Sequence, residues 1–225
     1  MTERRLLAID TSGTNALVAL GEADGTFVTE RRWVAGYRHG EELLSRIDEM
    51  LTNTGTFKSG IVGVVVGTGP GAFTGLRVGL ATAKALARGL GLSVGGVPTS
   101  EALLLAASLA GAARVTEAVL LLPAGPSDRV VVAGGLARLV RGGDPLEVEA
   151  GSTLVAVDLP GRAPAEALAL GELAQAGLSA ALLRLGAARI AQGGDDVSLL
   201  VPEYVTLPRG VPAMKGEVRW SHDSR

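Results

Sequence analysis

At 225 residues with 47% apolar content, the chain is long enough to bury the core of one large domain or of two small ones. A formal net charge of −2 and an aromatic content of 3% argue against unaided binding of RNA or DNA, which needs a basic surface and rings on which bases can stack. No cysteine is present, which excludes disulfides and thiolate metal sites.

Three short apolar runs separated by turn residues predict an antiparallel meander of strands at 6–10, 16–20 and 27–34. Apolar residues at helical spacing then predict an amphipathic helix around 43–51, ending before Gly55. The other elements of the first half alternate strand and helix, at 61–66, 74–90, 93–97 and 99–110. The predicted order is β-β-β-α-β-α-β-α.

Two tight antiparallel connections before the first helix exclude a plain doubly wound sheet, because parallel neighbours are joined by crossovers. The order matches the half-unit of the actin, Hsp70 and sugar-kinase superfold. We therefore predict an α/β, two-lobed fold with a first lobe at 1–110 and a smaller, degenerate second lobe at 111–210. The polar tail at 211–225 is expected to be flexible.

The second half has a weaker pattern than the first. Strands are predicted at 115–122, 129–133 and 153–157, and a helix at 165–192 with a break at Gly177. The segment VVVAGG at 130–135 superficially resembles an adenosine-binding turn of the superfold, but its position suits an ordinary hairpin better.

The stretch GTGPGAFTGLRVG at 67–79 joins a buried strand to a helix. A glycine-rich turn lets backbone N–H groups converge, and the helix start adds roughly half a positive charge, so phosphate binding is one interpretation. The other is a tight turn without a ligand. The chain lacks the Lys-Ser/Thr pair of a P-loop, and the G-x-G-x-x-G frame from Gly67 meets Ala72 at its last position.

The turn after the first predicted strand reads Asp-Thr-Ser-Gly-Thr. In the superfold named above, a D-x-G-T-like hairpin holds nucleotide phosphates with hydroxyl and amide donors, and its Asp lies near the metal. The alternative is an Asx-type turn that binds nothing. The candidate phosphate-binding residues of the two loops are Asp10, Ser12, Gly13, Thr14, Gly69 and Gly71.

The helix after the glycine loop carries a stripe of small residues, four apart, from Gly75 through Gly79 to Ala87. Arg77, Lys84 and Arg88 lie on a different face. A glycine inside a helix costs roughly 0.5–1 kcal/mol relative to alanine, so such a stripe is typical of close backbone approach. Internal packing is the favoured interpretation, and an exposed surface for association is the alternative.

No metal site is expected, because the chain has only two histidines, His39 and His222, and neither belongs to a recognisable ligand set. The start MTERRLLAID lacks the apolar core of a signal peptide, and the longest apolar run, 102–113, is too short to span a bilayer. We expect a cytoplasmic protein without a membrane contact.

Three segments resemble the bacterial TsaB (YeaZ-type) proteins, whose glycine loop usually reads G-P-G-S-F-T-G-L-R-I-G. They are LLAIDTS at 6–12, YRHGEELLSRIDEML at 37–51 and GTGPGAFTGLRVGLATAKALA at 67–87. The similarity is clear over 5–105, faint through the second half, and returns at 202–209, PEYVTLPR, which looks like the family's P-x-Y-L-R ending. The chain departs from the pattern at Ala72, where serine is usual, and at 122–126, where an Asp-Ala-Arg segment is typical.

The resemblance implies a non-catalytic subunit of the machinery that makes threonylcarbamoyladenosine on tRNAs. Catalysis there belongs to the paralogous TsaD, which acts with an ATPase, TsaE. TsaD-type paralogues carry a metal-binding H-x-x-x-H after a Gly-Val, and this chain places Thr99 and Leu103 at the two histidine positions after Gly96-Val97. Neither side chain can replace an imidazole as a metal ligand.

The partners implied are a TsaD-type subunit, a TsaE-type ATPase met through the complex, a second copy when the chain is alone, and tRNA only indirectly. No cofactor is required, although weak ATP or ADP binding fits the fold. Docking is expected through the helices at 43–51 and 74–90, with small and apolar side chains exposed in the protomer, so that Gly79→Trp or Leu43→Arg would prevent docking without unfolding. The expected interface residues are His39, Leu43, Ile47, Phe73, Thr74, Gly75, Arg77, Val78, Gly79 and Thr82.

Two enzymes are the alternatives. An ATP-dependent phosphotransferase or hydrolase of the superfold would use Asp10, Thr14 and the loop at 69–71, and would need a second acid from Asp128, Asp144 or Asp158. A metallopeptidase is disfavoured, because no H-E-x-x-H is present.

Overall fold

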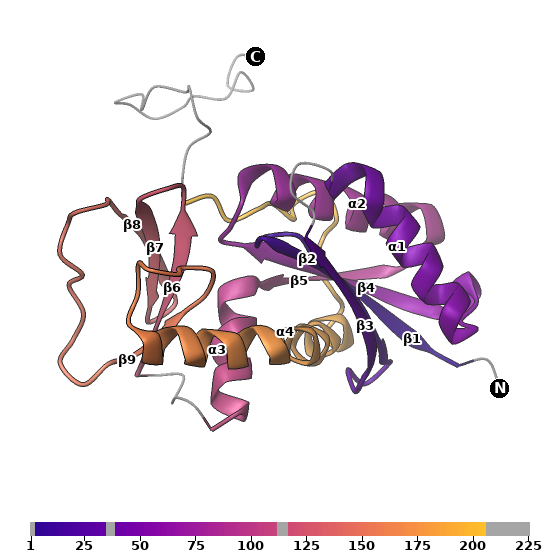
Figure 1. Cartoon of the computed structure of the whole chain (residues 1–225). Helices are drawn as coiled ribbons and strands as arrows, with labels where there is room; N and C mark the ends of the chain where they lie inside the picture. Colours follow the sequence, from indigo (N-terminus) through magenta and orange to yellow (C-terminus); the bar gives the residue numbers. More distant parts are fainter. Residues whose placement is uncertain (1–2, 35–38, 112–116, 206–225) are drawn as a thin grey trace, which may run out of the picture.

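The computed structural model describes residues 3–34, 39–111 and 117–205, and the predicted tail at 211–225 lies outside them. Two sheets lie side by side, with one long helix, at Ala165–Ala191, running beneath them (Figure 1). The larger sheet has five strands and the smaller has four. The predicted α/β, two-lobed fold class is confirmed.

The first sheet has the strand order β3-β2-β1-β4-β5. Its strands pair antiparallel from β1 to β3, which confirms the predicted meander, and parallel from β1 through β4 to β5. The elements in chain order are β1 Arg5–Asp10, β2 Asn15–Glu22, β3 Phe27–Val34, α1 His39–Thr54, β4 Ile61–Gly69, α2 Phe73–Leu90, β5 Ser93–Pro98 and α3 Thr99–Leu109, with a short 3-10 turn at Lys58–Gly60.

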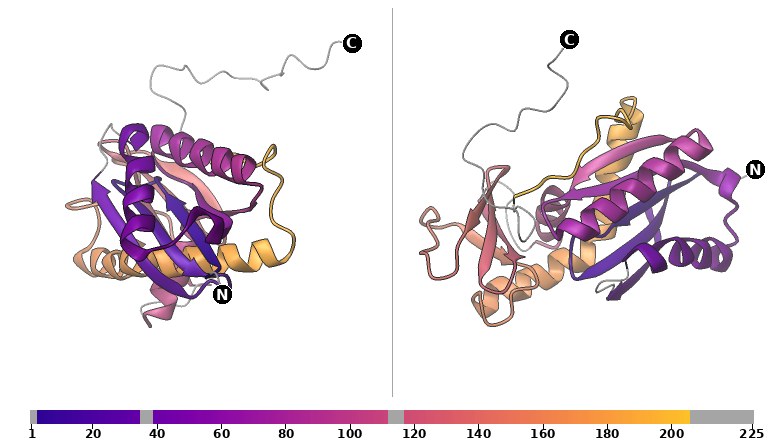
Figure 2. Two further views of the ribbon diagram at one scale, coloured as in Figure 1. Left: turned by 90° about the vertical axis from the view of Figure 1, so that its right-hand side faces the viewer. Right: turned by 90° about the horizontal axis from the view of Figure 1, so that it is seen from above.

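Alternate residues of the central strands feed two separate layers of core, as the period of a β-strand requires. Leu7 and Ile9 of β1 pack toward α1 and α2, whereas Leu6 and Ala8 pack toward α3 and the long helix α4, Ala165–Ala191. Figure 2 shows the first sheet between these two helix layers. The lobe is therefore a three-layer α/β/α unit.

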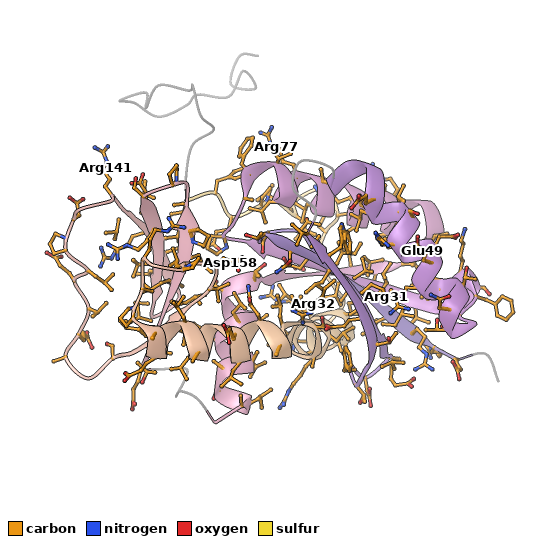
Figure 3. All side chains as sticks on the ribbon, in the orientation of Figure 1. Arg31, Arg32, Glu49, Arg77, Arg141 and Asp158 are labelled. Atoms are coloured by element: carbon orange, nitrogen blue, oxygen red, sulfur yellow. The ribbon has the colours of Figure 1, made fainter. Side chains whose placement is uncertain are left out.

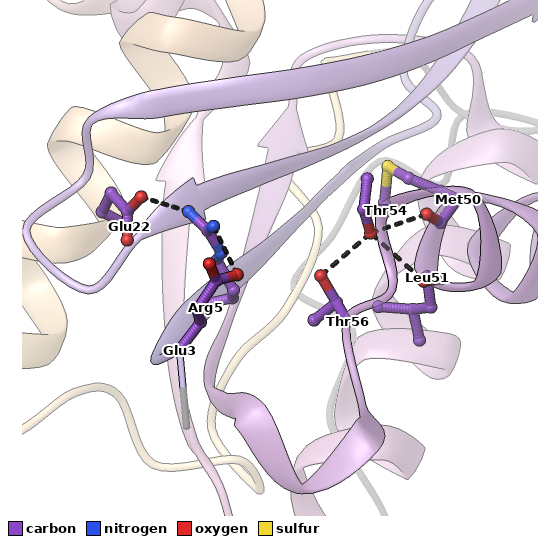
Figure 4. Close-up of polar contacts among 7 residues, drawn as sticks. All are labelled: Glu3, Arg5, Glu22, Met50, Leu51, Thr54 and Thr56. Carbon is purple, nitrogen blue, oxygen red and sulfur yellow. Dashed lines mark hydrogen bonds and ion pairs between the residues drawn. The ribbon is translucent and has the colours of Figure 1, made fainter. Parts of the chain in front are cut away.

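The ends of the first lobe are fixed by short polar contacts (Figure 4). Arg5 on β1 pairs with Glu22 across the β1–β2 ladder and with Glu3 at 2.7 Å. At the end of α1, the Thr54 hydroxyl lies 2.9 Å from the Met50 carbonyl, and Gly55 follows with φ 64°. The left-handed glycine ends the helix where the sequence predicted.

The second sheet has the order β8-β7-β6-β9, with β6 at Ala118–Ala124, β7 at Asp128–Ala133, β8 at Leu136–Val140 and β9 at Thr153–Ala156. β8 was not predicted. It pairs with β7 through a turn at Gly134 and Gly135, both with positive φ, so the hairpin interpretation of 130–135 is confirmed. The first residues of the strand predicted at 115–122 lie outside the described part, and β6 extends further than predicted.

Helix α4 joins the two lobes. It contacts α3, β9 and all five strands of the first sheet, so this helix from the second half of the sequence also covers one face of the first lobe. The predicted break at Gly177 is wrong, because α4 is continuous. A Cβ built on Gly177 would stand 2.9 Å from the Cβ of Ala106 in α3, so the glycine allows the two helices to pack closely. By length and composition α4 could also cross a membrane. Its buried side chains, among them Leu178, Leu182 and Leu183, instead belong to the core shared by both sheets.

Candidate functional site

A cleft of about 850 Å³ lies between the two lobes, a size typical of small-molecule sites. The turn after β1 and the glycine loop form one wall, and residues of β6, α3 and α4 form much of the other. Five of the six predicted phosphate-binding residues line it, namely Asp10, Ser12, Gly13, Thr14 and Gly71. The sixth, Gly69, is not among the lining residues; its position faces Leu76 and the Glu203 carbonyl.

Asp10 lies at the base of the cleft and is almost completely buried. Its Oδ1 accepts hydrogen bonds from the Ser12 amide at 2.9 Å and the Ser12 hydroxyl at 2.7 Å, and its Oδ2 accepts one from Thr99 Oγ1 at 2.6 Å. Burial raises the pKa of Asp10, although the bonds from Thr99 and Ser12 act in the opposite direction. Both carboxyl oxygens are thus used inside the protein.

The Thr99 hydroxyl extends this network. It accepts a hydrogen bond from the Gly69 amide at 3.2 Å while it donates to Asp10. A Cβ on Gly67 would lie 1.8 Å from Asp10 Oδ2, so only glycine at that position leaves room for the carboxylate. The network ties the ends of β1 and β4 to the start of α3.

The glycine loop packs directly on the first turn instead of being held open around a ligand. The Ala72 amide donates to the Ser12 carbonyl at 2.7 Å, and a Cβ on Gly71 would lie 2.3 Å from that same oxygen. Thr11 Oγ1 donates to the Gly75 carbonyl at 2.6 Å. The Ala72 N–H, one of the backbone donors of the glycine loop, is therefore already paired within the protein.

Asp158, which follows β9, reaches across the cleft to the first turn. Its Oδ2 accepts from the Thr14 amide at 3.3 Å and its Oδ1 from Gln175 Nε2 at 3.0 Å. Asp158 has φ 54°, a left-handed conformation that is uncommon for residues other than glycine. The carboxylate occupies the place of an anion beside Thr14 and would repel a phosphate there. Of the three distal acids considered, Asp128 and Asp144 do not line the cleft.

Arg32 is the only cationic side chain among the described residues that line the cleft. Its guanidinium is already paired with Glu30, at 2.7 Å to Oε1 and 2.9 Å to Oε2. Burial alone would raise the pKa of Glu30, but hydrogen bonds from Arg32 and Ser179, together with the Arg32 charge, lower it. Arg32 is thus committed to joining β3 to α4 and offers little charge to a phosphate.

Thr99 and Leu103, at the two positions for which the resemblance implies histidines in TsaD-type proteins, both line the cleft and are buried. A threonine hydroxyl that already donates to Asp10, and a leucine, supply no imidazole lone pair. Within the described residues, no group of three or more His, Asp or Glu side chains is placed to hold a metal ion.

The expected interface residues divide into buried and accessible ones. Leu43 and Ile47 are buried in the core between α1, α2 and the first sheet, and Gly75 and Gly79 are buried on the inner face of α2. The expectation that these four residues lie exposed is therefore wrong. The physical reason is that these residues pack on the chain's own sheet. A Cβ on Gly79 would stand 2.2 Å from Thr11 Oγ1, which confirms internal packing of the small-residue stripe.

The other expected interface residues are accessible: Thr74 and Arg77 are exposed, and Phe73, Val78 and Thr82 are half-buried. His39 begins α1, but its side chain lies outside the described part, as does all of His222. Sequence reasoning missed Tyr204, whose ring lies 5.0 Å from that of Phe73 and whose hydroxyl is 2.9 Å from Arg77 Nε. The P-x-Y element at 202–204 was the available signal.

Comparison with known proteins gives consistent results. A family model described as "TsaD: tRNA N6-adenosine threonylcarbamoyltransferase" matches residues 33–206. The Escherichia coli tRNA threonylcarbamoyladenosine biosynthesis protein TsaB is 39% identical over 95 residues, which are 42% of this chain and 40% of that protein. The Haemophilus influenzae protein of the same name is 38% identical over 102 residues, 45% of this chain and 41% of that one. The chain thus matches less than half the length of these curated relatives.

Among solved structures, YeaZ from Pseudomonas aeruginosa superposes with a TM-score of 0.64 at 23% identity, covering 89% of this chain and 99% of that one. This likeness confirms the fold. Since the family model spans more than three quarters of the sequence, the chain belongs to the tRNA N6-adenosine threonylcarbamoyltransferase (TsaD) family and is a TsaB (YeaZ)-type protein within it.

Proposed function

We propose that this chain acts in tRNA threonylcarbamoyladenosine synthesis as a non-catalytic subunit that binds and activates a TsaD-type transferase in the cytoplasm. A TsaE-type ATPase would join through that complex, and tRNA would be contacted only indirectly. The curated relatives named for this pathway support the pathway assignment. The scaffold role is supported by the cleft itself.

The observation that carries the scaffold role is the Asp10–Thr99 hydrogen bond of 2.6 Å. It uses up the carboxylate and the hydroxyl at two positions where a metal-dependent relative would need free ligands. Leu103 supplies only a buried hydrocarbon at the next such position. With Asp158 filling the anion place beside Thr14, the cleft favours internal bonding over phosphoryl chemistry. No cofactor is required by this proposal, and any ATP or ADP binding would be weak.

The docking surface we propose is the outer face of α1 and α2. Its accessible residues include Leu44, which is 56% exposed, and Thr74 and Arg77. An interface of this kind must bury on the order of 1,000 Å² in total to be specific. In the absence of the partner, the same face would support self-association.

The test is reconstitution. Purified chain, TsaD-type and TsaE-type proteins, ATP, an activated threonylcarbamoyl donor and unmodified tRNA should together form the modified nucleoside, and the chain with the donor and tRNA but without the other two proteins should form none. Leu44→Arg should abolish the complex, while Leu173→Arg, at a position 46% exposed on the opposite helix layer, should leave it intact. Modification by the chain alone would refute the proposal.

The phosphotransferase alternative is tested in parallel. ATP turnover by the purified chain, compared with that of Asp10→Asn, should show no activity that depends on Asp10. Turnover that disappears in the variant would favour an enzyme.

A further inference from the structure

Helix α2 carries three cationic residues and no acidic one. Arg77, Lys84 and Arg88 are separated by seven and four residues, so at about 100° per residue they fall within roughly 20° of one line along the helix. They span about 16 Å of its length at about 1.5 Å per residue. We call these three residues the basic stripe.

The stripe faces outward. Arg77 and Arg88 are exposed and Lys84 is half-buried, and Arg77 points away from the ribbon near the start of α2 (Figure 3). Within the described residues, no carboxylate forms an ion pair with any of the three. Lys84 has a weak internal counterpart in Asp196, whose pKa is lowered chiefly by hydrogen bonds from Ser198 and least by the Lys84 charge.

Arg77 is held in place by two aromatic rings. Its guanidinium carbon lies 3.8 Å from the centre of the Phe73 ring and 5.8 Å from that of Tyr204. Its Nε–H donates to the Tyr204 hydroxyl at 2.9 Å. The two terminal nitrogens of the Arg77 guanidinium form no hydrogen bond with the described residues, so they are available to an acceptor. The ring contacts and the bond to Tyr204 orient the planar guanidinium before any partner binds.

We propose that the basic stripe binds an acidic helix of the partner protein, with the Arg77 fork taking one of its carboxylates in a bidentate pair. This inference rests on the proposed function, because it assigns the chemistry of the partner at the α2 surface. Arginine clamped by aromatic rings is typical of the residues that dominate protein–protein binding. A bidentate carboxylate pair uses the two terminal nitrogens that Tyr204 leaves free.

The surface between the cations favours a protein over the other possible occupants. The outer surface of α2 is apolar and made of small side chains at Val78, Ala81 and Ala85, so a partner helix can approach it closely. A nucleic acid would need more cationic side chains than these three to bind its phosphates. A second copy facing α2 with its own α2 would place cations opposite cations. Such like-charge contacts make self-association through this face weaker than docking of an acidic helix.

The experiment measures binding of the full chain to the TsaD-type partner by calorimetry at low, intermediate and high salt. Arg77→Glu and Arg88→Glu should each weaken binding about tenfold or more at low salt. Arg141→Glu makes the same charge change at an exposed site of the second lobe and should bind as the wild type does. Tyr204→Phe keeps the ring but removes the hydroxyl that accepts the hydrogen bond from the Arg77 Nε–H, and should weaken binding severalfold.

The positive control is a charge swap: replacing one acidic residue on the partner by lysine should restore binding to Arg77→Glu. The inference is overturned if wild type, Arg77→Glu and Arg141→Glu bind the partner equally, and the proposed function survives that result. It is equally overturned if Arg77→Glu weakens only tRNA binding or only self-association. If the wild type does not bind the partner at all, the proposed function fails, and this inference with it.

Discussion

Two glycines of α2 should respond in opposite directions to the same substitution. Replacing a helical glycine by alanine normally stabilises a protein by roughly 0.5–1 kcal/mol. Gly89 has no atom within 4 Å of its would-be Cβ, so Gly89→Ala should show that gain. At Gly79 the new methyl would stand 2.2 Å from Thr11 Oγ1, which donates to the Gly75 carbonyl.

The expected loss at Gly79 follows from these contacts. Forcing the Thr11 hydroxyl aside costs about 1–3 kcal/mol for the buried hydrogen bond and about 1–3 kcal/mol for overpacking. After subtraction of the helix gain, Gly79→Ala should lower the free energy of unfolding by about 1–5 kcal/mol. Urea denaturation followed by circular dichroism measures both variants.

A double-mutant cycle isolates the cause. Thr11→Ala removes the hydroxyl, so Gly79→Ala should cost much less in that background than in the wild type. The reasoning is refuted if Gly79→Ala stabilises the protein as Gly89→Ala does, because the close approach of α2 to β1 would then be absent.

Three further outcomes are expected. Leu43→Arg should destabilise the fold severely, because the side chain is 1% exposed, whereas Leu44→Arg, at 56%, should change the free energy of unfolding by less than about 0.5 kcal/mol; equal melting temperatures would contradict this. Gly171→Ala should destabilise α4 packing, since its Cβ would meet the Ala156 carbonyl at 1.8 Å, and an unchanged urea midpoint would count against it. Burial raises the pKa of Asp10 above its ordinary 3.8, so the folded form holds that proton more tightly; the stabilisation this gives is complete below about pH 4 and is lost as pH rises through the raised value. The unfolding free energy of the wild type minus that of Asp10→Asn should therefore fall as pH rises, and a difference that stays constant or increases would contradict the raised pKa.

The first lobe could be predicted almost element by element, because its boundaries are set locally. Turn residues separate β1 from β2 and β2 from β3, and Gly55 and Gly91, both with positive φ, end α1 and α2. Such signals depend on backbone conformation at single residues and are readable without tertiary information. The antiparallel meander of the first three strands then followed from the short lengths of their connections.

The second lobe resisted prediction because its pattern depends on contacts between distant segments. β8 is mostly exposed and has no continuous apolar run, so its pairing with β7 decides its structure. Gly177 resembles a helix break in sequence, yet α3 packs against it. Asp158 could be nominated as an acid, but its position beside Thr14 follows only from the relative placement of the two sheets.

The small residues of α2 show why a sequence pattern identified close packing but not the neighbour. Spacing by four places Gly75, Gly79 and Ala83 on one face of the helix, and either a sheet of the same chain or another subunit could pack against that face. The Thr11 and Ser12 bonds decide between them: they fasten the start of α2 to the turn after β1. Because that fastening buries the small stripe inward, the opposite side of α2, with its cations, is presented at a fixed position and orientation. The turn after β1 thus holds in place the outer face of α2, on which we propose that the partner docks.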